Sequence, residues 1–161
     1  MKKILLSLVF AMALLFTANG QYKNAVSIDL ISFGAPSLEY ERFVYSENNH
    51  HFSVKGVMGY SIPWSGLVTG FEAVYGFGNH HRLEVGLGGA FLHTRFGDVD
   101  DYREIMGALR INYAYYSKSN PMIYRIGWMP QLSHRLSNDF SSDLKTFYHL
   151  NTITIGIGYR F

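Results

Sequence analysis

The chain has 161 residues, which suits one domain, and no cysteine, which excludes disulfides, thiolate metal sites, a cysteine nucleophile and a lipidated cysteine anchor. The chain has 14 Lys and Arg residues and 12 Asp and Glu residues. Two of the bases, Lys2 and Lys3, lie in a segment that we expect to be removed. The remaining chain is then neutral, which gives no argument for nucleic-acid binding.

The first 20 residues predict a secretory signal peptide. A lysine pair is followed by an apolar core at residues 4–16 and by a small-residue cleavage site ending at Gly20. This apolar run is shorter than the roughly 20 residues that a membrane helix needs. We therefore expect residues 1–20 to be cleaved near Gly20 and residues 21–161 to form one domain without a linker.

The mature chain alternates apolar and polar residues with period two and is cut by Gly, Pro, Asn and Asp, a pattern typical of antiparallel strands. We expect eight strands, at residues 24–32, 37–45, 51–62, 66–77, 82–94, 103–116, 122–129 and 148–161. The connectors at 95–102 and 130–147 are the long ones and would face outward, with both termini on the periplasmic side. In the second, an apolar residue at every fourth position predicts a short amphipathic helix or a loop over the barrel mouth.

One face of these strands is apolar, as at Ile153, Ile155, Ile157 and Tyr159 of the last strand. A soluble ligand-binding barrel would turn this face inward, and a membrane barrel would turn it to lipid. The second face is rich in glycine, which suits the narrow lumen of an eight-stranded barrel. These glycines are Gly59, Gly70, Gly76, Gly86, Gly88, Gly127, Gly156 and Gly158.

The second face also carries acids and bases in equal number, and charges enclosed in a lumen must be paired to offset desolvation. This lumen charge network comprises Asp29, Glu39, Glu41, Lys55, Glu72, Arg82, Glu84, Arg110, Arg125 and Arg160. We therefore predict an all-β fold, a closed antiparallel up-and-down transmembrane barrel. The soluble ligand-binding barrel is the rival.

Aromatic residues concentrate toward strand ends, where an interfacial girdle would need them. They are Tyr45, Tyr60, Trp64, Tyr75, Tyr115, Tyr116, Trp128 and Tyr159. The exception on the apolar face is Arg42, which could reach the interface with its long side chain or be shifted in phase by a bulge.

The C-terminal segment 155–161, with its terminal Phe161 and with Tyr159 two residues before it, resembles the signal by which outer-membrane barrels engage their assembly machinery. Segments 81–88 and 124–130 also resemble small outer membrane protein X-like barrels. The resemblance implies the outer membrane of a Gram-negative bacterium, a porin-like β-barrel domain, and contacts with lipid, lipopolysaccharide and the assembly machinery. We expect a monomer. Activity does not follow from the resemblance.

Some eight-stranded barrels modify lipid A, and the deacylases among them use a His-x-Ser-Asn motif with a later Glu. The nearest match places His134 and Ser137 one residue too far apart, and no Glu follows Glu104. A serine nucleophile needs its base within hydrogen-bond reach. We expect no catalytic residues and keep a deacylase-like enzyme as the alternative.

Two further hypotheses are a narrow channel and a metal site. At this strand number paired charges fill the interior, so a plugged lumen is favoured over a conducting one. The pairs His50-His51 and His80-His81 lie at connectors, where polar turns explain them without a metal. We expect no metal or cofactor, and a non-enzymatic structural or surface-interaction role through the outer loops.

Overall fold

A computed structural model of the chain describes residues 23–47, 49–61, 66–96, 99–136, 146–149 and 153–161. The signal peptide expected at residues 1–20 lies outside them. Within the described residues, no helix is present that is long and apolar enough to cross a membrane. The strands are β1 (Asn24–Ser32), β2 (Ala35–Glu47), β3 (His50–Ser61), β4 (Gly66–Gly78), β5 (His81–Phe96), β6 (Val99–Tyr116), β7 (Met122–Trp128), β8 (Gln131–Leu136), β9 (Thr146–His149) and β10 (Ile153–Arg160).

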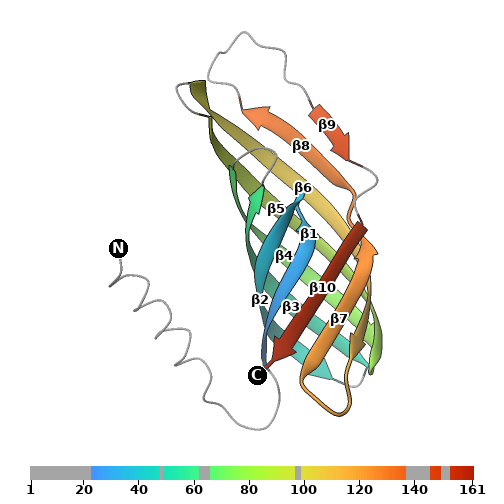
Figure 1. The fold of residues 1–161 in the computed structure, drawn as a ribbon. Coiled ribbons are helices and arrows are strands. Elements are labelled where there is room, and N and C mark those ends of the chain that lie inside the picture. The colour runs from blue at the N-terminus through green and yellow to red at the C-terminus, as the bar shows by residue number, and fades with distance from the viewer. Residues whose placement is uncertain (1–22, 48, 62–65, 97–98, 137–145, 150–152) are drawn as a thin grey trace, which may run out of the picture.

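The sheet closes on itself. Strands β1 to β7 pair in chain order, β7 pairs with β10, and β10 pairs with β1, all antiparallel (Figure 1). The closure is tied at the end of the barrel where the Asn24 amide donates to the Phe161 carbonyl at 3.1 Å and the Phe161 amide donates to the Asn24 carbonyl at 2.9 Å. The prediction of a closed eight-stranded antiparallel barrel is confirmed. We call this end the terminal end and the opposite one the far end.

The prediction of a connector at residues 130–147 is wrong in part. Strand β8 follows β7 after the break at Met129 and Pro130 and pairs with the first half of β6, while β7 pairs with the second half. Strand β9 then pairs with β8. The expected amphipathic helix does not occur in β8 or β9, and residues 137–145 lie outside the described part. Proline interrupts the ladder because it has no amide hydrogen, but the strand resumes directly after it.

The expected long connector at residues 95–102 is also wrong. Strand β5 continues to Phe96 and β6 begins at Val99, and these two residues pair. Asp100 and Asp101, which favour turns, belong to β6. Together β5, β6, β8 and β9 extend the sheet at the far end beyond β1 to β4 (Figure 1). The compact connectors expected at residues 78–81 and 117–121 are confirmed.

The apolar face of the strands is the outer face. Leu87 is 67% exposed, Phe71 63% and Ile28 55%, whereas the acids of the same strands are buried. Arg42 lies on this outer face. A bulge shifts the register between Phe43 and Tyr45, after Arg42, so it does not turn Arg42 inward.

Candidate functional site

The barrel interior is layered, and strand β2 shows the order of the layers. From the far end to the terminal end its inward side chains are Ala35, Ser37, Glu39, Glu41 and Phe43. The sequence runs from small to acidic to aromatic because alternate residues of a strand share one face. The interior therefore has an apolar layer, two charged layers and an aromatic layer.

The apolar layer at the far end is a plug of mutually packed buried side chains. It consists of Phe33, Ala35, Val57, Val68, Ala90, Leu92, Met106, Ala108 and Met129. Phe33 reaches it from the first turn, where Phe33 has φ 49° and Gly34 has φ 76°. Positive φ at both central residues is the geometry of the two-residue hairpin turn that matches strand twist. Burial of the Phe33 ring offsets the cost of its left-handed backbone.

The first charged layer is centred on Arg110. Its guanidinium donates to Asp29 at 2.8 Å and to Glu39 at 2.8 Å, and its Nε lies 3.0 Å from a Glu72 oxygen. Lys55 Nζ lies 3.6 Å from the other Glu39 oxygen. All five side chains are at most 3% exposed. One guanidinium thus links acids from three strands, β1, β2 and β4.

The second charged layer is centred on Arg125. Its Nη2 donates to Glu41 at 2.6 Å and its Nε to Glu84 at 2.9 Å. The Tyr116 hydroxyl donates to Glu84 at 2.7 Å and accepts from Arg125 at 3.1 Å. Ser53 donates to Glu41. Each carboxylate therefore has a cation and a hydroxyl as partners, which offsets the cost of removing it from water.

Lumen-facing glycines provide the space for these polar groups. A Cβ at Gly76 would overlap the His51 ring, and a Cβ at Gly86 would overlap the Glu72 carboxylate. At Gly127 it would overlap Asn112. At these three positions the glycine leaves room for a large side chain of the neighbouring strand.

The aromatic layer at the terminal end is built on Tyr116. The Arg82 guanidinium lies 3.9 Å from the Tyr116 ring centre, and that of Arg160 lies 5.1 Å from it. His51 packs edge-on against the same ring and receives a hydrogen bond from Arg82 at 3.0 Å. The His51 Nε2 lies 3.5 Å from Glu84. These cations over an aromatic face close the lumen beneath the second charged layer.

Of the predicted lumen charge network, all members except Arg82 and Arg160 are buried, and these two are half-buried at the terminal end. The assignment of Tyr116 to an outer girdle is wrong, since it is 1% exposed inside the barrel, whereas Tyr45, Tyr60, Tyr75, Trp128 and Tyr159 are exposed on the outer face. Tyr115 is half-buried on the outer face, and Trp64 lies outside the described residues. Sequence reasoning also missed the inward position of His51, which it put at the start of the third strand and explained as part of a polar turn.

The other histidines of the two pairs have protein partners. His50 contacts the Tyr75 hydroxyl, His81 the Tyr113 hydroxyl, and His80 the Tyr116 carbonyl. No cluster of metal-ligating side chains occurs in the described part of the chain.

The structure describes only one member of the weak catalytic pair. His134 lies in β8, where its backbone pairs with Ile105 and Thr146. Ser137 lies outside the described residues.

No family model, curated protein or solved structure matches the chain. The function of the chain has therefore to be inferred from its geometry. That geometry is a closed barrel with an apolar outer wall and an interior filled by paired charges between an apolar plug and an aromatic layer.

Proposed function

We propose that the chain is a non-enzymatic integral barrel of a bacterial outer membrane with a plugged lumen, exported by its N-terminal segment. The observation that carries this is the outer wall. Leucine, isoleucine, phenylalanine and tyrosine side chains that are about half exposed occur on β1 to β7 and on β10. Soluble monomers rarely expose contiguous apolar patches of more than a few hundred Å².

The strand lengths support the same proposal. Strand β3 has 12 residues and β4 has 13. A membrane-spanning strand tilted by about 45° needs roughly 9–11 residues. The exposed Tyr75 and Tyr159 toward the terminal end, with Tyr60 and Trp128 toward the far end, fit two interfacial belts.

The proposed role is structural or in surface interaction, through the part of the sheet that extends past the barrel at the far end. A lipid A-modifying enzyme remains a second hypothesis only through His134 and Ser137. A narrow conducting channel is disfavoured because Arg110 and Arg125, each held by two or more acids, cross the lumen.

Membrane fractionation combined with a detergent gel tests the proposal. We expect the chain in the outer-membrane fraction, migrating faster before boiling than after it, because a closed barrel stays compact in detergent. A chain found in the soluble periplasmic fraction, with one mobility, would overturn it.

A further inference from the structure

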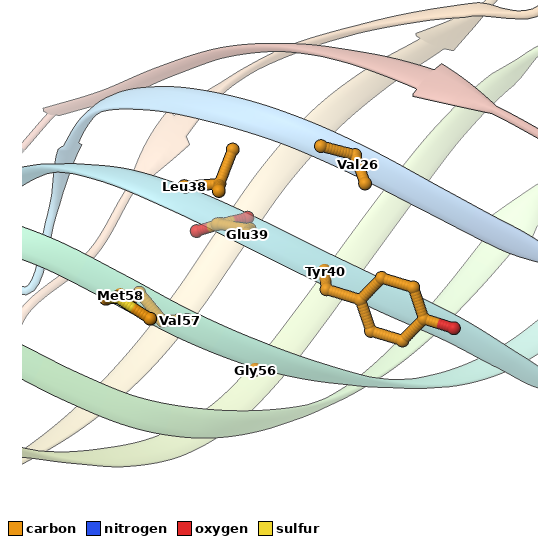
Figure 2. Close-up of a pocket in the computed structure, with 7 residues that line it drawn as sticks. All are labelled: Val26, Leu38, Glu39, Tyr40, Gly56, Val57 and Met58. Atoms are coloured by element: carbon orange, nitrogen blue, oxygen red, sulfur yellow. The ribbon is translucent and has the colours of Figure 1, made fainter. Parts of the chain in front are cut away.

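The outer wall has a groove at Gly56, where glycine has no side chain to fill the space. It has a volume of about 270 Å³ and is lined by Val26, Leu38, Glu39, Tyr40, Gly56, Val57 and Met58. Figure 2 shows Leu38 and Tyr40 on the strand beside Gly56, Val26 one strand farther away, and Met58 on the same strand as Gly56. Glu39 and Val57 are at most 4% exposed and point into the lumen, so they contribute main chain to the groove floor.

Gly56 makes the groove. It lies between Tyr40 on β2 and Phe71 on β4 in the register of the sheet. A Cβ at Gly56 would have no atom within 4 Å, so nothing in the described chain fills the space. The exposed lining is almost entirely apolar. Its natural occupant is an alkyl chain.

A cation lies beside this groove. Arg42 is exposed on the same face of β2, toward the terminal end. Its Nη1 donates to Asn24 Oδ1 at 2.8 Å, and the Tyr40 hydroxyl donates to the same oxygen at 2.9 Å. Asn24 thereby fixes Arg42 next to Tyr40.

The guanidinium of Arg42 keeps free hydrogen-bonding capacity. Among the described residues, none forms an ion pair with Arg42, and its Nη2 and Nε make no hydrogen bond. A guanidinium fork matches the geometry of a phosphate. Arg42 therefore offers a binding group for an anion at the edge of an apolar groove.

The spacing of the two features fits one lipid molecule. From Leu38 to Arg42 the strand rises about 13 Å at about 3.3 Å per residue. At a strand tilt of about 40° this is a depth difference of about 10 Å. A lipid whose phosphate binds Arg42 would thus place the first part of one acyl chain in the groove. Because Arg42 lies toward the terminal end, this lipid belongs to the periplasmic leaflet of the proposed orientation.

The geometry points to a binding site for an anionic glycerophospholipid, with the phosphate on Arg42 and one acyl chain against Gly56. This inference rests on the proposed function, since it needs the outer wall to face a bilayer. The basic side chain supplies headgroup preference and the groove supplies acyl-chain retention. The two parts can be removed separately.

The test uses the full mature chain in nanodiscs of equimolar phosphatidylglycerol and phosphatidylcholine with identical acyl chains. After transfer to mild detergent, native mass spectrometry counts the lipids that stay bound. We expect phosphatidylglycerol to be retained about fivefold over phosphatidylcholine, equivalent to about 1 kcal/mol for one arginine. Arg42→Gln should bring that ratio to about one while acyl-chain retention persists.

Filling the groove with Gly56→Leu should reduce retention of both lipids. The matched controls are Lys118→Gln, which removes an exposed cation from a turn, and Gly107→Leu, which fills another outer-face glycine with no atom within 4 Å of its Cβ. Both controls should behave as the wild type.

Outcomes separate the two proposals. A chain that does not insert into nanodiscs overturns the proposed function. A folded, inserted barrel that retains both lipids equally, or whose ratio is unchanged by Arg42→Gln, overturns the lipid site alone. If native mass spectrometry instead detects a lipid-free dimer, and Gly56→Leu abolishes this dimer, the groove binds a second copy of the chain and the lipid site is overturned.

Discussion

Removing the cation at the centre of the second charged layer should be strongly destabilising. Arg125 is 4% exposed and contacts Glu41 at 2.6 Å and Glu84 at 2.9 Å. Arg125→Met leaves both carboxylates buried without a cation. Breaking a buried pair by removing one partner costs about 3–5 kcal/mol. We expect the free energy of unfolding to fall by about 4 kcal/mol.

The measurement is a urea titration of barrels refolded into phospholipid vesicles, followed by Trp fluorescence and gel mobility. The matched control is Lys118→Met, which removes an exposed cation and should change stability by less than about 0.5 kcal/mol. A triple variant, Arg125→Met with Glu41→Gln and Glu84→Gln, removes the uncompensated charges and should recover to within about 2 kcal/mol of the wild type.

The triple variant also keeps the reasoning testable if Arg125→Met fails to refold. An Arg125→Met barrel within about 1 kcal/mol of the wild type would show that water, and not Arg125, compensates these acids. A triple variant no more stable than Arg125→Met would show that the loss has another cause.

Three further predictions concern the lumen glycines, the plugged lumen and the weak catalytic pair. Gly76→Ala should lower the free energy of unfolding by about 1–3 kcal/mol because the His51 ring must move. Gly56→Ala places its methyl group in open space and should change the free energy of unfolding by less than about 0.5 kcal/mol. Equal effects of the two variants in a urea titration would contradict the faces assigned to these glycines. Planar-bilayer recordings should show no discrete conductance steps, and regular steps that persist in preparations free of residual denaturant would refute the plug. Replacing His134 and Ser137 with alanine should leave lipid A unchanged by mass spectrometry, and an altered acylation pattern would support the enzyme.

The sequence was sufficient to predict which residues share a face. Alternation with period two assigned Asp29, Glu39 and Arg110 to one face and Leu87 to the other, and the structure places them on those faces. Equal numbers of acids and bases also pointed to an enclosed set of charges. These features are local, so they need no knowledge of which strands meet.

The partners within the interior could not be predicted, because they depend on register and on how far each side chain reaches across the lumen. Arg110 contacts acids that lie far from it in the chain, on β1, β2 and β4. Tyr116 was misassigned because it was grouped with the other aromatics at strand ends, although it lies six residues after Arg110 and so on the same face of β6. His51 was missed in the same way, although it lies four residues before Lys55 on the inward face of β3.

The two wrong connectors have a common cause. Turn-forming residues near residue 97 and Pro130 signalled strand ends, yet pairing with a long neighbouring strand overrides local preference. Phe96 pairs with Val99 across a short connection, and β8 resumes on β6 directly after Pro130. The pairing of β8 with β6 joins residues more than 20 positions apart, so the local pattern around Pro130 does not show it.

The apolar outer wall should contact lipid, and a spin label on this wall reports the contact. The chain has no cysteine, so Leu87→Cys gives one labelling site at the most exposed large apolar side chain of the wall, and Lys118→Cys gives a matched site in a terminal-end turn. In vesicles, power-saturation measurements should show a nitroxide at position 87 that collides with oxygen far more than with a water-soluble nickel complex, and the reverse at position 118. Collisions dominated by the nickel complex at position 87 would show that this wall faces water and not lipid.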